Sequence, residues 1–385
     1  MFGVVVQITD LQTVVVDAAS EFLANPSASK RTWMFVEIHT DEGLLGIGEC
    51  SQSRLDAGVA VAIDEMKSYF IGKNPVGLMH EARQHWLNNP YANRIRYAAV
   101  SGIEQALWDL TGKALDQPVY VLLGGAVRED IPLYANLSQA TQSRSPSDLA
   151  EAASRAVADG FQAVKIYPFP QPAEVAFGRG VALTNEERDL AESRIQAVRE
   201  AIGPDIKLHT DWAWAVTPAD AKQMADRLLP YDLFWIEEPF KEDDHAELSA
   251  LRRLIQPRLA GGEQLSKLIS FRELFEHRAL DVVMPDVKWI GGISAFREVD
   301  AIASVYDVEI APHNMSGPIA TASSVHLSAV SNNFLSLEYG YAGVPWRDEL
   351  VNGTERVENG AIPLPTAPGL GIEWDGDAAR RLSAG

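Results

Sequence analysis

Short apolar runs alternate with amphipathic segments of helical period throughout the chain from Ile131 onward. Two of the amphipathic segments begin with candidate capping boxes, Thr184 with Glu187 and Ser270 with Glu273. Eight alternations within about 210 residues predict an α/β fold of the (β/α)8 barrel type. An open, doubly wound sheet is the alternative, but no glycine-rich phosphate-binding turn follows any run. The eight runs are IPLYANL, AVKIY, IKLHTD, LFWIEE, LAGGE, DVVMPD, VEIAPH and FLSLE.

The residues before this region carry a mixed pattern. Residues 3–17 and 31–49 alternate like β-strands, and the second stretch contains an acidic turn ending in glycine, which is a hairpin signal. Residues 58–72 and 78–116 have the period of amphipathic helices. The mixture predicts a small α+β domain.

These patterns divide the chain into three segments. We expect the α+β domain to occupy residues 1–125 and the barrel to occupy residues 126–340. Residues 341–385 are rich in proline, glycine and tryptophan. We expect this tail to return to the first domain rather than to form a third one.

The overall composition narrows the classes of function. Of the 385 residues, 46% are hydrophobic and 22% are charged, which is typical of a globular chain and excludes a disordered or fibrous one. The net charge of −20 argues against a nucleic-acid partner. A single cysteine, Cys50, excludes an internal disulfide framework and fits a reducing compartment. Since no membrane span or secretion signal is visible, we expect a cytoplasmic protein without a membrane partner.

Polar residues that carry acid–base or metal chemistry close successive apolar runs. From the third run onward they are separated by 26, 26, 23, 27 and 25 residues, one for each β/α repeat. The carboxyl ends of barrel strands converge on one mouth, where active sites are built. One such residue could simply be a solvated charge, but six in register predict a site. They are Asp211, Glu237, Glu263, Asp286, His313 and Glu338.

Three of the six are carboxylates from consecutive strands, Asp211, Glu237 and Glu263. Side by side they would repel one another, and a shared dry site would raise their pKa values. A hard divalent cation resolves the repulsion, and oxygen ligands suit one Mg2+ ion. Zinc fits less well, because none of the three is a histidine or cysteine. The alternative is that a carboxylate here, such as Glu238 beside Glu237, pairs with a lysine instead.

Two further pairs complete the candidate site. Asp286 and His313 lie on adjacent predicted strands, and a carboxylate beside an imidazole makes an acid–base dyad. Lys165 and Tyr167 are two residues apart and therefore share one strand face. The lysine could lower the pKa of the phenol and make Tyr167 a base, or it could bind a substrate carboxylate. A packed tyrosine with a satisfied hydroxyl is the alternative for Tyr167.

The order of these residues resembles the mandelate racemase-like branch of the enolase superfamily, the mandelate racemase/muconate lactonizing enzyme family. The resemblance spans most of the chain. Its motifs are AAVSGIEQALWDLTGKALDQPVYVLLGG (98–125), WIEEP (235–239), GGEQL (261–265), MPDVKWIGGISAFREV (284–299) and APHN (311–314).

The resemblance implies an α+β capping domain, completed by the tail, that closes over a modified (β/α)8 barrel. Mg2+ on the three carboxylates would bind the carboxylate of a small-molecule substrate, and a base would remove the adjacent α-proton. The match assigns the metal to Glu237 rather than Glu238, acid–base roles to His313 and Asp286, and a place near the enolate oxygen to Glu338. It also implies a homo-oligomer.

Two positions depart from the family pattern. Lys165-Ile166-Tyr167 stands where Lys-x-Lys is usual, which argues against a racemase with two matched bases and resembles acid-sugar dehydratases. The third strand ends Asp211-Trp212-Ala213 in place of Asp-x-Asn, and the aromatic Trp214 follows. We therefore expect a lyase that dehydrates a sugar monoacid or diacid to a 2-keto-3-deoxy acid. A racemase, epimerase or cycloisomerase, and a catalytically silent metabolite-binding relative, are the alternatives.

Five residues are candidates for contact with substrate. By the resemblance, Phe22 and Asn25 would lie on one capping loop, and Cys50 on the other. A small buried hydrophobe is the alternative for Cys50. Arg54 is a candidate anchor for a distal carboxylate, with a solvated arginine as the alternative. Trp214 adds aromatic surface beside the third strand.

Overall fold

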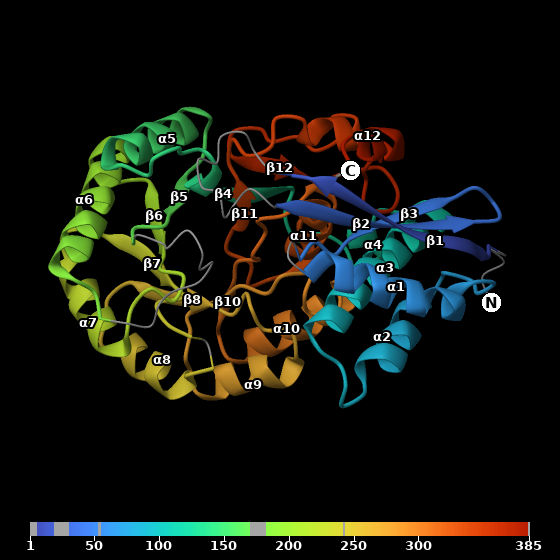
Figure 1. The fold of residues 1–385 in the computed structure, drawn as a ribbon, viewed down its shortest axis with the longest axis horizontal. Coiled ribbons are helices and arrows are strands. Elements are labelled where there is room, and N and C mark those ends of the chain that lie inside the picture. The colour runs from blue at the N-terminus through green and yellow to red at the C-terminus, as the bar shows by residue number, and fades with distance from the viewer. Residues whose placement is uncertain (1–5, 19–30, 53–54, 170–181, 242, 384–385) are drawn as a thin grey trace.

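The computed structural model describes residues 6–18, 31–52, 55–169, 182–241 and 243–383. Figure 1 shows a ring of strands surrounded by helices and, beside it, a small antiparallel sheet with helices of its own. The ring is the predicted barrel, and the small sheet belongs to the predicted N-terminal α+β domain.

All eight apolar runs form strands of one parallel sheet. Its order is β11-β4-β5-β6-β7-β8-β9-β10, so strands that follow one another in the chain are neighbours except at the closure. The strands are β4 (Asp130–Asn136), β5 (Ala163–Ile166), β6 (Lys207–Asp211), β7 (Leu233–Glu237), β8 (Arg258–Gly261), β9 (Val282–Val283), β10 (Glu309–Ile310) and β11 (Leu337–Gly340).

The sheet closes into a barrel between β10 and the residues that lead into β11. The backbone N–H of Ile310 donates to the carbonyl of Asn333 at 2.9 Å, and Leu335 N–H donates to the Ile310 carbonyl at 2.8 Å. Ile310 and Phe334 form a parallel bridge. The predicted barrel is thereby confirmed.

Seven helices, not eight, complete the barrel repeats. The last strand is followed by the tail, and residues 341–375, all described, contain no α-helix. The eighth strand is therefore followed by the tail, which is the modification of the barrel. The seven are α5 (Pro146–Ala158), α6 (Asn185–Ile202), α7 (Pro218–Arg227), α8 (His245–Arg252), α9 (Leu268–Glu276), α10 (Ile293–Val305) and α11 (Pro318–Val330).

One of the two predicted capping boxes exists. Thr184 accepts from the N–H of Glu187, whose carboxylate accepts from the N–H of Thr184, so α6 begins as predicted. Ser270 caps nothing, because α9 already begins at Leu268. The apolar side chain of Leu268 packs against the barrel core, which extends the helix beyond its polar signal.

The interior of the barrel below the site is filled by side chains. Tyr134, Trp235 and Met284 are fully buried there with several small residues. His209 stacks on Trp235 with ring centroids 3.5 Å apart. This packed floor leaves only the carboxyl ends of the strands open for chemistry.

The N-terminal sheet is antiparallel, in the order β1-β2-β3. Its strand β3 packs closely on helix α3, and a Cβ on Gly48 would lie 1.9 Å from the carbonyl of Gly102. The predicted helix 78–116 is two helices, because Asn93 caps α3 by accepting from Arg96 N–H at 3.1 Å. The elements are β1 (Ile8–Asp17), β2 (Thr32–Thr40), β3 (Leu45–Glu49), α1 (Asp56–Phe70), α2 (Met79–Leu87), α3 (Arg94–Ala114) and α4 (Val119–Leu122).

The tail contacts both parts of the molecule. Its strand β12 (Ala361–Pro363) pairs antiparallel with β4 of the barrel. Near α12 (Gly376–Arg381), the Trp374 indole N–H and the Arg380 guanidinium donate to the carboxylate of Glu37 on β2, at 2.7 and 2.6 Å. The tail thus reaches the N-terminal sheet, as the resemblance implies.

Two buried carboxylates of the N-terminal part cap barrel helices. Glu104 of α3 accepts from the N–H groups of Ile293 and Ser294, at 2.7 and 3.0 Å, at the start of α10. Glu49, the last residue of β3, accepts from the N–H groups of Gly317 and Ala320, at 2.8 and 2.9 Å, at the start of α11. These contacts fix the N-terminal part against the two helices that follow β9 and β10.

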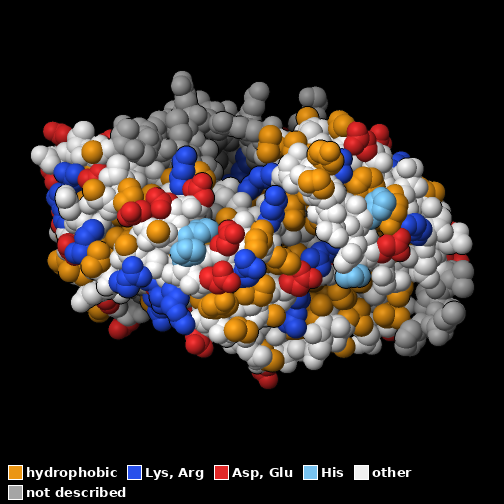
Figure 2. All heavy atoms as spheres, turned by 90° about the horizontal axis from the view of Figure 1, so that it is seen from below, with side chains coloured by type: hydrophobic (Ala, Val, Ile, Leu, Met, Phe, Trp, Pro, Cys, Tyr) orange, Lys and Arg blue, Asp and Glu red, His pale blue; other side chains and the backbone are white. Residues whose placement is uncertain are grey.

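The surface mixes charges of both signs. Figure 2 shows Lys and Arg interspersed with Asp and Glu and with hydrophobic side chains on one face. The Arg83 guanidinium of α2 donates to the Glu298 carboxylate of α10 at 3.0 and 2.8 Å. None of the helices in the described part of the chain combines the length and apolar character needed to cross a membrane.

Candidate active site

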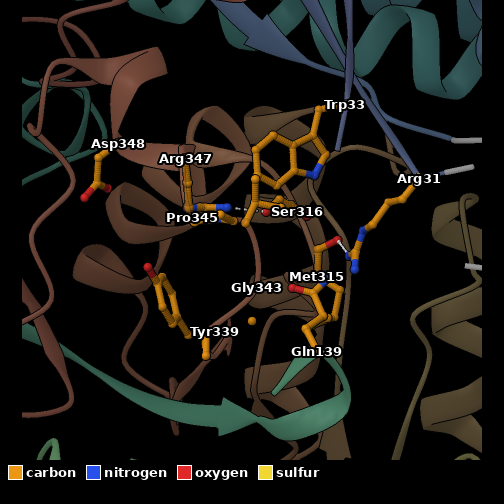
Figure 3. A pocket seen from close by; sticks show the side chains of 13 residues that line it. Arg31, Trp33, Gln139, Met315, Ser316, Tyr339, Gly343, Pro345, Arg347 and Asp348 are labelled. Atoms are coloured by element: carbon orange, nitrogen blue, oxygen red, sulfur yellow. Dashed lines mark hydrogen bonds between the residues drawn. The ribbon is translucent and has the colours of Figure 1, made fainter. Parts of the chain in front are cut away.

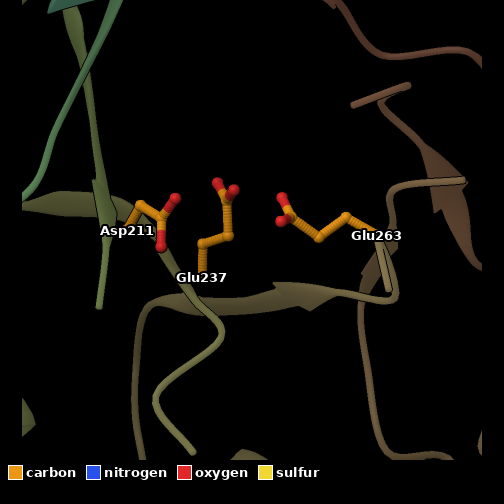
Figure 4. Close-up of side chains that lie close together, drawn as sticks. All are labelled: Asp211, Glu237 and Glu263. Atoms are coloured by element: carbon orange, nitrogen blue, oxygen red, sulfur yellow. The ribbon is translucent and has the colours of Figure 1, made fainter. Parts of the chain in front are cut away.

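Three carboxylates from consecutive strands face one another at the barrel mouth. Asp211 ends β6, Glu237 ends β7 and pairs with it in register, and Glu263 follows β8 by two residues. One oxygen from each lies within 4.8 Å of the others, and all three side chains are buried. Figure 4 shows them turned toward a common point. The structure thus brings together the group that the sequence predicts as metal ligands.

Unusual backbone beyond the strands positions these side chains. Gly262, just before Glu263, has φ of +98°, and Glu238 has φ of +43°. Ala213 and Trp214 also lie in the left-handed region, at +44° and +58°. A left-handed conformation costs a non-glycine residue about 1–2 kcal/mol, so such residues persist where the surrounding structure holds them. Here the Trp214 N–H donates to the Glu238 carbonyl at 2.8 Å, which joins two of these turns.

Burial and mutual repulsion raise the pKa values of the three carboxyls. Burial raises the pKa of Glu263 to about 7; His313 opposes the rise and the charge of Asp211 adds to it. Burial also raises the pKa of Glu237 well above its usual range, against the attraction of Lys165. The pKa of Asp211 is raised for the same reason. Such a group would be stabilised by an added cation.

Lys165 is a fully buried cation among these carboxylates. Its Nζ lies 2.6 Å from Glu237 Oε1, 2.7 Å from Glu338 Oε1 and 3.8 Å from Asp211 Oδ2. Burial opposes its charge, but Glu237 and Glu338 raise its pKa well above the usual value. Lys165 therefore pairs with Glu237.

Glu338 is held in its ionised form. Asn136 Nδ2 donates to its Oε1 at 2.7 Å, and the Asn314 N–H donates to its Oε2 at 2.8 Å. Burial alone would raise the pKa of Glu338, but the charges of Lys165 and His313 lower it to about 2. Asn136 was not among the predicted site residues, because the first apolar run, IPLYANL, ends in leucine and places Asn136 one position earlier.

His313 and Asp286 form the predicted pair. His313 Nδ1 lies 2.7 Å from Asp286 Oδ2, which leaves Nε2 facing Glu263 Oε2 at 3.4 Å and Glu338 Oε2 at 3.8 Å. Burial would lower the pKa of His313, but these carboxylates raise it. Nε2 is therefore the nitrogen available to move a proton at the mouth.

A second buried lysine supports Asp286. Lys288 Nζ donates to Asp286 Oδ2 at 2.8 Å and to Ser316 Oγ at 2.6 Å. Burial would raise the pKa of Asp286, but Lys288 and His313 lower it to about 2. Lys288 lies within the motif MPDVKWIGGISAFREV, but no role was predicted for it. Its position two residues after Asp286 was the available signal.

Tyr167 lies near Asp211, so Lys165 is not the only charge that acts on its hydroxyl. Asp211 is the charge that acts most strongly on its hydroxyl. Burial and the charge of Asp211 raise the pKa of Tyr167 well above 10, and Lys165 offsets only part of this. Lys165 does lower the pKa of Tyr167, as expected, but burial and the charge of Asp211 outweigh it, so the pKa rises overall.

The candidate substrate residues are only partly brought to the site. Cys50 is fully buried in the core of the N-terminal part, where its Sγ approaches the Met34 carbonyl at 3.8 Å. Its assignment as a substrate contact is therefore wrong, because it packs inside the domain. Trp214 lies in the turn after β6, at the mouth. Phe22, Asn25 and Arg54 lie outside the described residues.

Comparisons with known proteins agree with this geometry. Residues 10–124 match the mandelate racemase/muconate lactonizing enzyme N-terminal domain, and residues 148–378 match the enolase C-terminal domain-like family. D-xylonate dehydratase of Haloferax volcanii is 31% identical over 378 residues, which cover 97% of this chain and 88% of that protein. D-galactonate dehydratase of Ralstonia pickettii is 30% identical over 350 residues, 89% of each chain.

Solved structures show the same overall similarity. A mandelate racemase/muconate lactonizing enzyme from Sulfitobacter sp. superposes with a TM-score of 0.87 and 28% identity, covering 99% of this chain and 96% of that one. A member of the enolase superfamily from Salmonella Typhimurium superposes with a TM-score of 0.87 and 26% identity, covering 99% of both chains.

Proposed function

The chain belongs to the mandelate racemase/muconate lactonizing enzyme family of the enolase superfamily, and from this premise we propose that it dehydrates a sugar acid. The reaction removes the hydrogen α to the carboxylate and the hydroxyl on the β-carbon, so that one water is lost. The enol that remains tautomerises to a 2-keto-3-deoxy acid. The observation that carries the proposal is His313 Nε2 directed at a cluster of three facing carboxylates.

The carboxylate cluster fits Mg2+. Its donors are all oxygens, they lie within 4.8 Å of one another, and their raised pKa values indicate a site that an added cation would stabilise. Asp211, Glu237 and Glu263 would hold the ion. When bound, Mg2+ supplies Lewis-acid stabilisation of the negative charge that develops on the substrate carboxylate.

The chain's own residues move the protons. We assign both transfers to His313 Nε2, which takes the α-proton and returns a proton to the departing β-hydroxyl on the same face. Asp286 holds Nδ1 at 2.7 Å and so orients the ring. Lys165 and Asn136 keep Glu338 charged and in place beside this nitrogen. The raised pKa of Tyr167 disfavours the phenolate that a tyrosine base would require.

Solvent-isotope exchange tests the function and the assignment of the base. The protein, loaded with Mg2+, is incubated in D2O with xylonate, gluconate, galactonate and glucarate, and a 2-keto product is the expected result. Exchange of the α-proton without such a product would instead indicate an epimerase or racemase. Neither product nor exchange would indicate a silent binding protein.

Two variants separate the candidate bases. His313→Asn should lower kcat by about 10²-fold or more, since general acid–base catalysis contributes about 10²–10⁴-fold. Tyr167→Phe should keep α-proton exchange close to the wild-type rate. If Tyr167→Phe abolishes exchange while His313→Asn retains it, Tyr167 is the base and our assignment is wrong.

A further inference from the structure

Glu237 is the most enclosed of the three facing carboxylates, and both of its oxygens have protein partners. It is 0% exposed, whereas Asp211 and Glu263 are each 5% exposed. In Figure 4 it lies between the other two. Lys165 Nζ lies 2.6 Å from its Oε1, and the indole N–H of Trp235 donates to its Oε2 at 3.1 Å. A carboxylate held at both oxygens keeps one orientation, so the direction of its lone pairs is set before any ion arrives.

The indole donor and the carboxylate belong to one strand. Trp235 precedes Glu237 by two residues on β7, so both side chains lie on the face that points into the barrel. Trp235 is part of the packed floor, and Glu237 ends the strand at the mouth. An indole has one donor and no acceptor, so its bond to Oε2 uses the whole hydrogen-bonding capacity of the Trp235 side chain.

Two other rings of the floor fix the indole in place. His209 of β6 pairs with Trp235 in register and stacks on it, with ring centroids 3.5 Å apart and planes 22° apart. Tyr134 meets the indole edge-on at 5.2 Å. Neither ring nitrogen of His209 has a hydrogen-bond partner among the described residues, so His209 holds the indole through the face of its ring. All three residues are at most 1% exposed, which leaves the indole no room to rotate.

The cavity that adjoins the mouth does not reach this floor. Figure 3 shows this cavity of about 350 Å³, whose walls include Arg31 of the N-terminal part and Tyr339, the residue after Glu338. Among the described residues that line it there is neither Trp235 nor one of the rings that pack on it. Water in the cavity therefore cannot replace the indole beneath Glu237, and Oε2 depends on Trp235 for its hydrogen bond.

We propose that Trp235 is a positioning residue for Glu237 and that it makes the carboxylate cluster select Mg2+ over the larger Ca2+. Mg2+ demands nearly ideal octahedral geometry, with oxygens at about 2.0–2.1 Å, whereas Ca2+ accepts flexible arrangements at about 2.3–2.6 Å. A carboxylate fixed at both oxygens suits the stricter ion. The inference rests on the metal site of the proposed function and extends it, because an all-oxygen donor set alone does not distinguish the two ions.

Calorimetric titration with Mg2+ alone and with Ca2+ alone tests the proposal. Trp235→Phe keeps an aromatic ring in the floor and removes the N–H. Loss of a hydrogen bond to a metal-binding carboxylate costs about 10–100-fold in affinity, so Mg2+ binding should weaken by about tenfold or more. Ca2+ binding should weaken by less than about threefold, because Ca2+ tolerates a carboxylate that moves. The preference for Mg2+ should therefore fall.

Trp108→Phe is the matched control. The indole N–H of Trp108 also donates to a buried carboxylate, Glu104 Oε1 at 2.9 Å, but this carboxylate caps α10 and does not face the cluster. The variant should leave the affinities for both ions within about twofold of the wild type. A comparable loss of Mg2+ preference in Trp108→Phe would show that the effect comes from weakened packing in general, and it would overturn the proposal.

A second replacement separates the N–H from the packing. Benzothienylalanine in place of Trp235 has nearly the shape of tryptophan and carries sulfur where tryptophan carries the N–H. The floor then stays filled, even if the smaller phenylalanine leaves a cavity that prevents folding. This replacement should reproduce the loss of Mg2+ preference. Urea unfolding of the metal-free protein shows that its fold persists.

The remaining outcomes distinguish this proposal from the proposed function. If both replacements of Trp235 bind the two ions as the wild type does, the positioning role is overturned while the metal site stands. Equal losses for Mg2+ and Ca2+ would show that Trp235 supports the site without selecting the ion, which also overturns the proposal. If the wild-type protein binds neither ion, the metal site of the proposed function fails, and the positioning role fails with it.

Discussion

Two regions of this molecule each contain a group of buried carboxylates, and the partners of the two groups differ. At the barrel mouth, Asp211, Glu237 and Glu263 face one another. At the interface between the N-terminal part and the barrel, Glu49 and Glu104 face the backbone N–H groups that begin α11 and α10. Burial raises pKa values in both regions.

The comparison shows that burial alone does not mark a functional acid. The interface carboxylates satisfy helix N-termini, where unpaired N–H groups and the helix dipole favour a negative charge. The mouth carboxylates are directed at one another, and Lys165 balances only part of their charge, so an added cation would stabilise them. Removing a charge at the mouth should therefore destroy activity, whereas removing a charge at the interface should lower stability.

Glu237→Gln should have the largest effect, on activity. It removes one charged ligand, and a metal's charge stabilisation is worth several kcal/mol, so turnover should fall by about 10³-fold or more. The free energy of unfolding without metal should change much less, because reduced repulsion at the mouth offsets part of the lost ion pair with Lys165. Calorimetric Mg2+ titration and urea unfolding measure both; unaltered Mg2+ affinity would refute the metal site.

Acidification should weaken metal binding while leaving the interface intact. The pKa of Glu263 is about 7 without metal, so below this pH the ion must displace a proton. Mg2+ affinity should rise about tenfold per pH unit up to about pH 7 and level off above it. Titrations in buffers of different ionisation enthalpy count the released protons. A flat affinity from pH 5.5 to 7 would contradict the prediction.

Glu104→Gln should lower stability and spare the metal site. The amide loses the charge that accepts from Ile293 and Ser294, which should reduce the free energy of unfolding by about 1–3 kcal/mol. Mg2+ affinity should stay within about twofold of the wild type, because α10 lies beyond the carboxylate cluster. A loss of metal binding as large as that of Glu237→Gln would remove the distinction between the regions.

Thr184→Ala should have the smallest effect. It removes an exposed cap within one segment, which costs about 1 kcal/mol. Turnover should not change, because the Thr184 side chain is exposed and its cap serves only the first turn of α6. Urea unfolding and steady-state kinetics test this. A stability loss exceeding that of Glu104→Gln would show that a cap across the interface stabilises the protein no more than a cap within one segment.

The sequence predicted the barrel and most of its mouth for a physical reason. Parallel strands buried on both faces form apolar runs, and the polar residue that ends each run must lie at the mouth. Lys165, Asp211 and His313 were identified in this way. The first run ends in an apolar residue, Leu137, so the rule that the last polar residue lies at the mouth does not single out Asn136.

The remaining features depend on contacts between distant parts of the chain. Glu104 caps a helix 189 residues away and Glu49 one that begins 268 residues away, and no local pattern encodes such pairs. The pKa of Tyr167 depends on its burial and on the charge of Asp211, which only the folded geometry determines.

The return of the tail has a consequence for how the chain is made. Glu37 is separated by 337 residues from Trp374 and by 343 from Arg380, the two groups that bind its carboxylate. At a synthesis rate of about 5–20 residues per second, the N-terminal sheet waits ~20–70 s on the ribosome for these partners. Closing so long a loop early is also entropically costly. The barrel can therefore assemble first. The N-terminal sheet is translated before the barrel, but it is completed only after the barrel.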